Sequence, residues 1–185
     1  MAHAPGISLD LRPSGTLDLA EHLDRGDLDL AIGAMPAPVE RFRDQLLFND
    51  NFVAVMRQGH PACVTGTSMT LATLAELSHL ILSSTGDGTE FVDAALAAEG
   101  LERRIALRAP LLTAAAILAQ SDMVAVMAAR SARAFSQLTP LHILALPFPS
   151  PSIVTAMLWH RRFDDLAAHR WLRGIVRRAS AASGG

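Results

Sequence analysis

The sequence predicts an α/β fold in which mostly parallel strands are covered on both faces by helices. Half of the 185 residues are apolar, which is enough to bury a sizeable core. Strand-like and helix-like patterns also alternate along the chain. Residues 19–33 contain half of an αβ crossover: a helix that ends at Gly26 is followed by Leu28, Leu30 and Ile32, which alternate as in a strand.

The first part of the chain begins with alternating apolar and polar residues at positions 7–11, which favours a strand. Thr16 is a residue type that caps helices, so we expect a helix from there to about residue 25. The next expected elements are strands at residues 28–32, 46–48 and 52–56, a helix at residues 70–77, and a strand at residues 79–82.

In the second part, we expect helices at about residues 89–98, 111–120, 129–137 and 164–179, and strands at residues 105–107, 123–127, 141–146 and 153–159. The helix at 111–120 is apolar nearly all round, so we expect it to be buried. In the last helix, the spacing puts Trp171 inward and Arg173 outward. Three prolines within residues 147–151 prevent a regular connection, which indicates a crossing between two parts of the fold.

Charge and composition exclude several classes of protein. Sixteen basic and eighteen acidic residues give a net charge of −2, so the chain as a whole has no electrostatic attraction for nucleic acid. The single cysteine, Cys63, cannot form an intrachain disulfide, which fits a reducing cytoplasm. We find neither a signal peptide nor a membrane-spanning stretch, and we expect a cytoplasmic protein that does not bind membranes.

Several segments, in order, resemble the effector domain of the LysR-type transcriptional regulators. The best of them is the helix, glycine turn and strand from Leu23 to Gly33. The others are residues 53–55 with the turn Gly59-His60-Pro61, and residues 71–77, 100–102 and 121–127. Each motif alone is only a common local structure. Their order and separation carry the resemblance, which covers residues 5–178.

This resemblance implies two Rossmann-like lobes similar to a type 2 periplasmic binding protein, joined by two crossover segments with a small effector in the cleft. Lobe one would comprise residues 7–49 and 151–180, lobe two residues 50–150, and residues 181–185 would form a flexible tail. Family members also carry an N-terminal winged helix-turn-helix, and their effector domain opens with a strand and a helix. We do not find these parts, so the resemblance implies a truncated first lobe, DNA binding only through a missing domain, and a homodimer or higher homo-oligomer.

Candidate effector contacts lie in the loops that follow strands, because open α/β sheets leave a crevice at the carboxyl ends of their strands. The candidates are Ser14, Thr16, Met35, Ser83, Ser84, Thr85, Gly88, Pro110, Leu111 and Leu112. Small polar residues before a helix would suit a carboxylate, whereas the leucines would suit an aromatic or other apolar part. Ordinary helix capping explains the serines and threonines about as well, and core burial explains the leucines about as well.

The sequence gives little support for catalysis. The seven histidines show no metal-binding spacing, Cys63 has no neighbour in sequence that would activate it, and Asp164-Asp165 fits a helix N-terminus. Arg161-Arg162 fits a solvated surface better than a nucleic-acid contact. We therefore expect no enzyme activity, no cofactor and no metal. The function expected is that of a small-molecule effector-sensing domain of a transcriptional regulator. The alternatives are a stand-alone small-molecule-binding protein of the same fold and an enzyme built on it.

Overall fold

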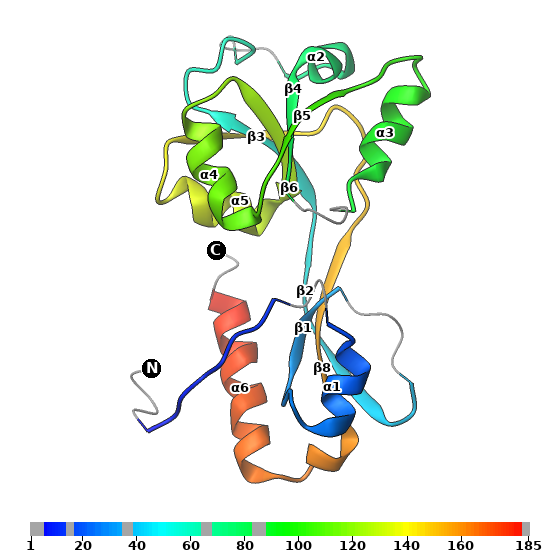
Figure 1. Ribbon diagram of the computed structural model, residues 1–185, viewed down its shortest axis with the longest axis vertical. Coiled ribbons are helices and arrows are strands. Elements are labelled where there is room, and N and C mark those ends of the chain that lie inside the picture. The colour runs from blue at the N-terminus through cyan, green and yellow to red at the C-terminus, as the bar shows by residue number, and fades with distance from the viewer. Residues whose placement is uncertain (1–5, 14–16, 35–38, 64–67, 83–87, 183–185) are drawn as a thin grey trace.

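The computed structural model describes residues 6–13, 17–34, 39–63, 68–82 and 88–182. These residues form two β-sheets with separate sets of helices, which follow one another along the long axis of the molecule (Figure 1). We call them the small lobe and the large lobe.

The small lobe contains α1 (Leu19–Arg25), β1 (Ala31–Gly33), β2 (Phe42–Asp50), β8 (Ile153–His160) and α6 (Ala167–Ala182). Its sheet has the strand order β1-β8-β2, and both strand pairs are antiparallel. Gly26 ends α1 in the left-handed conformation, φ 81°, as the sequence predicts. The core of this lobe is small and centres on Leu23, Ala31, Phe42 and Leu158.

The large lobe contains β3 (Phe52–Arg57), α2 (Leu71–Glu76), β4 (Ser78–Ile81), α3 (Glu90–Ala97), β5 (Arg104–Arg108), α4 (Leu111–Ala119), β6 (Met123–Ala128), α5 (Ala129–Ser136) and β7 (Leu141–Ala145). Its strand order is β5-β4-β6-β3-β7. Alternate residues of β3 belong to two different core clusters: Val53 and Val55 pack with α4 and α5, and Ala54 and Met56 pack with α2 and α3. The sheet is therefore covered on both faces, which explains why the middle of β3 is apolar at consecutive positions.

The chain passes between the lobes twice. Only Asn51 separates β2 from β3, and the proline-containing stretch after β7 leads into β8 (Figure 1). The α/β class is confirmed, but the expectation of mostly parallel strands is wrong for the described strands. Among the described strands, the parallel pairs are β4 with β5 and β4 with β6. Strand β3 is antiparallel to β6 and β7, and β8 is antiparallel to β1 and β2. Strand β3 enters the large lobe at the first crossing and runs away from it, opposite to β6 and β7. Strand β8 enters the small lobe at the second crossing and runs opposite to β1 and β2.

Three other expectations need correction. Residues 7–11 are extended but form no strand, and Leu9 and Leu11 are more than half exposed. Helix α4 buries only one face, since Leu112 is 84% exposed. The final helix continues to Ala182, so it includes the first two residues of the predicted tail, and residues 183–185 lie outside the described residues. The predicted lobe boundaries stay a prediction.

His79 in β4 makes stability depend on pH. The residue is 1% exposed, and its Nε2 donates to the carbonyl oxygen of Leu74 at 2.9 Å. Burial lowers the pKa of His79 from its ordinary value, so the folded protein keeps the ring neutral where the unfolded chain takes up a proton. Stability should therefore fall as the pH drops below about 6.5, by at most about 1.4 kcal/mol per pH unit from this group. Urea unfolding of wild type and His79→Gln between pH 5 and 7 measures the effect. The variant should lose part of the pH dependence, and equal slopes for both proteins would contradict the assignment.

Candidate functional site

The carboxyl ends of β4, β5 and β6 all lie on the side of the large lobe that faces the small lobe (Figure 1). The amide of Ala109, just after β5, donates to the carbonyl oxygen of Ile81 at 2.9 Å, so these two strand ends are adjacent. The amide of Ala129, just after β6, donates to the carbonyl oxygen of Asn51 at 2.8 Å. The end of β6 is thereby joined to the first crossing. This edge is where ligands bind in open α/β sheets.

Four of the predicted site residues belong to this edge. Gly88 has φ +68° and immediately precedes Thr89, the cap residue of α3. Pro110, Leu111 and Leu112 begin α4, and Leu111 is 38% exposed. The remaining candidates, Ser14, Thr16, Met35, Ser83, Ser84 and Thr85, lie outside the described residues.

The first turn of α4 combines apolar surface with amide donors. Pro110 occupies the cap position, and no side chain of the described residues caps this helix. The amide and the hydroxyl of Thr113 both donate to the carbonyl oxygen of Pro110, at 3.0 and 2.9 Å. The positive end of the helix dipole is thus presented beside the exposed side chain of Leu112, an arrangement that suits a ligand with a negative charge and an apolar body.

Arg103 fixes the start of α3, and sequence reasoning missed it. Its side chain is 4% exposed and forms two hydrogen bonds with the Asp93 carboxylate, at 2.6 and 2.7 Å. It also donates to the carbonyl and the hydroxyl of Thr89 at 3.3 Å each. Because Thr89 is 1% exposed, these bonds hold the cap residue next to Gly88 in one place. The ten-residue separation of Arg103 and Asp93 gives no local signal.

The first crossing is held by Asp50, which is 9% exposed. One carboxylate oxygen accepts from the amide of Asn51 at 2.9 Å, and the other accepts from the amide of Arg130 in α5 at 3.0 Å. The hydroxyl of Ser150, from the second crossing, accepts from the amide of Phe52 at 3.4 Å. These bonds tie the two crossings to each other and to the first turn of α5.

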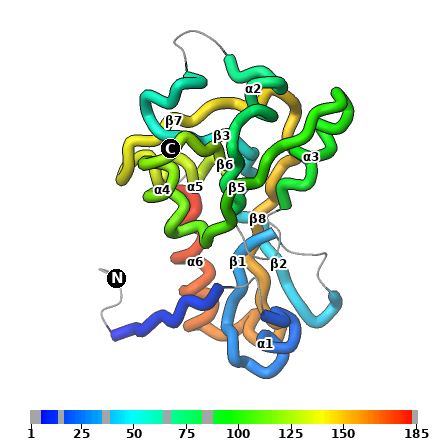
Figure 2. Tube along the Cα trace, turned by 45° about the horizontal axis from the view of Figure 1, so that its top comes forward, coloured from blue at the N-terminus to red at the C-terminus, as the bar shows by residue number. Residues whose placement is uncertain are grey.

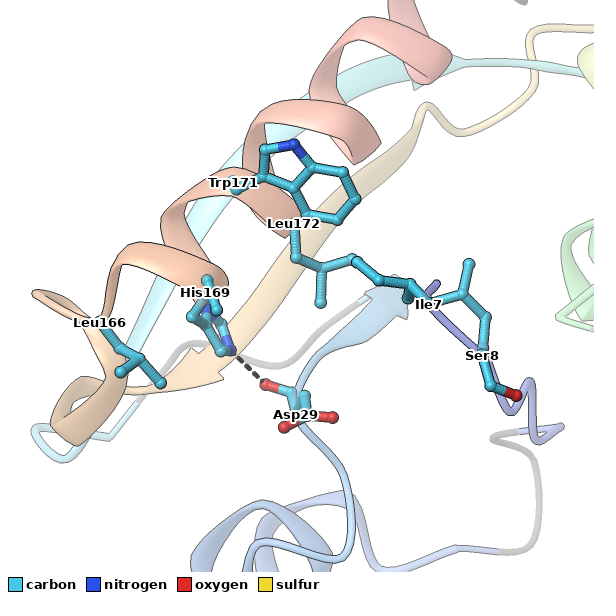
Figure 3. Close-up of a pocket in the computed structure, with 9 residues that line it drawn as sticks. Ile7, Ser8, Asp29, Leu166, His169, Trp171 and Leu172 are labelled. Atoms are coloured by element: carbon cyan, nitrogen blue, oxygen red, sulfur yellow. Dashed lines mark hydrogen bonds between the residues drawn. The ribbon is translucent and has the colours of Figure 1, made fainter. Parts of the chain in front are cut away.

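The described residues of the small lobe line at least three hollows beside the extended residues 7–12. The largest, about 310 Å³, separates these residues from residues 27–32 and from α6. A second, of about 160 Å³, continues toward Leu17 and Leu19. The third, of about 220 Å³, is lined by Ile7 and Trp171 among others and is shown in Figure 3. Residues of β1, which is an edge strand of its sheet, line the first two of these hollows.

His169 lines the third hollow but is not available as a base. Its Nδ1 accepts from the guanidinium of Arg173 at 2.7 Å, because an arginine can only donate. Its Nε2 therefore carries the proton and donates to the carbonyl oxygen of Asp29 at 2.8 Å (Figure 3). Arg173 also lies over the Trp159 ring at 4.6 Å, so it points inward, while Trp171 is 37% exposed. Both orientations are opposite to those the helical spacing predicts.

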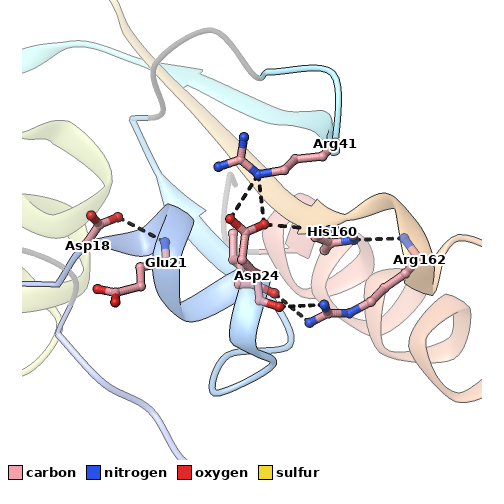
Figure 4. A network of polar contacts seen from close by, with 7 residues as sticks. Asp18, Glu21, Asp24, Arg41, His160 and Arg162 are labelled. Atoms are coloured by element: carbon pink, nitrogen blue, oxygen red, sulfur yellow. Dashed lines mark hydrogen bonds and ion pairs between the residues drawn. The ribbon is translucent and has the colours of Figure 1, made fainter.

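A polar network on the small lobe joins α1 to the sheet (Figure 4). The Asp24 carboxylate accepts from Nε of Arg41 at 2.9 Å and lies 3.6 Å from His160. The hydrogen bond from Arg41 lowers the pKa of Asp24 from its ordinary value, although the carboxylate is open to water. Arg162 donates to the carbonyl oxygens of Leu23 and Asp24 at 2.8 and 2.6 Å, which satisfies the end of α1. Each group has a structural partner, so this network stabilises the fold.

The described residues give little support for metal binding, for a nucleophilic cysteine or for a membrane-spanning helix. Within the described ranges, no three histidine, cysteine or carboxylate side chains gather in a way that would hold a metal ion. The Sγ of Cys63 lies 3.1 Å from the Sδ of Met56, and burial raises the pKa of this thiol, which makes it a poor nucleophile. Among the helices that the structure describes, none has the length and apolar character needed to cross a bilayer.

Two α/β lobes joined by paired crossings, with strand ends and helix N-termini between them, define a fold of the periplasmic-binding-protein type. The chain belongs to the LysR substrate binding domain family, whose model matches residues 1–181. It is 29% identical over 180 residues to the HTH-type transcriptional activator NahR of Pseudomonas putida, covering 95% of this chain and 59% of NahR. The chain thus spans somewhat more than half the length of this curated relative.

Solved structures show the same fold. The regulatory domain of MexT, a transcriptional activator in Pseudomonas aeruginosa, superposes with a TM-score of 0.82 at 24% identity, over 96% of this chain and 87% of that one. The BenM effector binding domain with its effector benzoate gives a TM-score of 0.69 at 19% identity, over 99% and 83% of the two chains. The curated relatives are transcriptional regulators, so the relationships do not favour a stand-alone binding protein or an enzyme.

Proposed function

We propose that this chain is the effector-sensing domain of a LysR-type transcriptional regulator, and that it binds a small carboxylate with an apolar or aromatic body between the lobes. In a longer protein, DNA would be bound by another domain. The chain would carry out no catalysis and would act in the cytoplasm, where bacterial transcription takes place. Self-association into a homodimer or a higher homo-oligomer belongs to the same proposal.

The observation that carries this proposal is the first turn of α4. Its helix N-terminus has no side-chain cap within the described residues, and it lies beside exposed Leu112 on the edge that faces the small lobe (Figure 1). The N-terminus of α3, held by Arg103, lies on the same edge. Helix N-termini favour anions, and the leucines supply an apolar wall. BenM, with which this chain shares its fold, is solved with benzoate as its effector.

Benzoate is the first probe for this site, and benzamide is its uncharged control. We expect titration calorimetry to detect benzoate binding, and Leu112→Gln to weaken it at least about fivefold, because about 1 kcal/mol of apolar contact is lost. Benzamide should bind more weakly than benzoate, since it lacks the charge that the helix N-terminus favours.

Leu138→Gln is the matched control, because Leu138 is 85% exposed in the turn after α5, away from the proposed site, compared with 84% for Leu112. It should leave the benzoate affinity unchanged. If the protein bound neither benzoate nor any member of a panel of aromatic, aliphatic and hydroxylated carboxylates, the proposed function would be wrong. Equal weakening by both substitutions would place the ligand elsewhere.

A further inference from the structure

The first turn of α5 in the large lobe is in contact with two elements of the small lobe through one side chain. The guanidinium carbon of Arg130 lies 3.8 Å from the centre of the Phe48 ring, in β2 just before the first crossing. The same guanidinium donates to the carbonyl oxygen of Ser180, in the last turn of α6, at 2.5 Å. Figures 1 and 2 both show the C-terminal end of α6 beside α5.

The chemistry of these contacts requires an arginine. The carbonyl oxygens in the last turn of a helix have no partner within the helix and form the negative end of its dipole, so they favour a cation. A planar guanidinium can stack on an aromatic ring and still donate from its edge, whereas an ammonium group cannot do both. The side chain is half-buried, and this reduces the screening of its charge by water.

The main chain of Arg130 is fixed independently of its side chain. Its amide donates to the carboxylate of Asp50, which belongs to the crossing itself. A rotation of the lobes about the crossings would keep this bond, because Asp50 lies at the crossing. It would separate the guanidinium from Ser180, because Ser180 moves with α6 of the small lobe. The contact between Arg130 and Ser180 therefore exists over only a narrow range of angles between the lobes.

We propose that Arg130 is a latch that fixes the angle between the two lobes by joining α5 to β2 and to the end of α6. The Arg130 contacts are present at one angle between the lobes and absent at another. A hinge with two states requires contacts that differ in this way between the states. The position of α6 then depends on the lobe angle. The further step, that the angle between the lobes depends on effector binding, rests on the proposed function. The latch itself is independent of the proposed function.

Spin-label distances between the lobes test the latch in the whole chain. The labels are placed at Leu138→Cys and Arg170→Cys in a Cys63→Ser background, because Leu138 and Arg170 are exposed and lie in different lobes. Arg130→Met keeps an apolar stem over Phe48 and removes the hydrogen bond to Ser180. We expect it to broaden the distance distribution at least about 1.5-fold relative to the labelled parent, as a latch-free hinge samples more angles.

Arg133→Met is the matched control, since Arg133 is an exposed arginine on the same helix, and it should leave the distribution unchanged. Arg130→Lys keeps the charge without the planar fork, and it should broaden the distribution to an intermediate extent. Circular dichroism establishes that each variant is folded. A distribution for Arg130→Met as narrow as that of the parent would overturn the latch.

Benzoate titration of the same variants separates the two proposals. If the latch is coupled to the effector site, Arg130→Met should change the benzoate affinity at least about twofold, and Arg133→Met should not. Broadening without binding of any carboxylate would support the latch and contradict the proposed function. Binding with an unchanged distribution in Arg130→Met would support the proposed function and overturn the latch.

Discussion

Replacing Leu118 by alanine should lower the free energy of unfolding by about 3 kcal/mol. Leu118 is fully buried in α4, in the cluster that joins this helix to β3 and β6. Alanine loses the transfer free energy of the missing carbons and leaves a cavity that the surrounding elements fill only in part. Urea unfolding should show a lower midpoint with an unchanged slope, since the surface exposed on unfolding stays nearly the same.

Leu138→Ala is the control for this prediction, because the same chemical change is made at a side chain that is 85% exposed. Its effect should stay within about 0.5 kcal/mol. A loss of less than 1 kcal/mol at Leu118 would mean that α4 does not pack as described. The start of α4 would then also be wrongly placed, and the proposed effector site depends on that position.

The sequence predicts the helices well, because their signals are local. Gly26 ends α1, Thr70 caps α2 through the amide of Thr73 at 3.1 Å, and the apolar spacing of α3 buries Val92 and Leu96. Each of these features depends on residues within one or two turns of each other. Such features can be predicted without knowing the fold.

The strands are predicted less well, because a strand needs a partner. Residues 7–11 alternate as a strand should, yet they pair with no described residue and stay exposed. The converse holds for the start of β2, where Arg43, Asp44 and Gln45 have no strand pattern but pair with β8. The pairing of β2 with β8 spans more than a hundred residues, and residues 7–11 lack any described partner strand. No local pattern contains either piece of information.

The candidate site shows the same division. The sequence is enough to place Gly88 and residues 110–112 after strands, because the order of strands and helices along the chain shows which loops follow a strand. In open α/β sheets, ligands bind at the carboxyl ends of the strands. Asp50 and Arg130, which join the lobes, are eighty residues apart and carry no motif. The helical spacing puts Arg173 outward, but its guanidinium packs over the Trp159 ring and donates to His169. Contacts between distant segments therefore account for what sequence reasoning missed.

Replacing Asp50 by alanine should destabilise the chain by about 2 kcal/mol, at the upper end of the range for a lost helix cap. The carboxylate is 9% exposed and accepts from two amides, those of Asn51 at the crossing and Arg130 at the start of α5. Alanine leaves both donors without this acceptor in a place that water reaches poorly. Asp50→Asn keeps one carbonyl acceptor and loses the charge, so it should cost about half as much.

Asp44→Ala is the matched control for this last prediction, because Asp44 is an exposed aspartate of the same strand whose side chain forms no hydrogen bond or ion pair with the described residues. Its effect should stay within about 0.5 kcal/mol. Asp50 joins the crossing to the first turn of α5, which carries Arg130. The losses of unfolding free energy caused by Asp50→Ala and Arg130→Met should therefore not be additive, and a double-mutant cycle should give a coupling above about 0.5 kcal/mol. Equal stabilities of Asp50→Ala and Asp44→Ala, measured by urea unfolding, would show that the crossing is held by its strands alone.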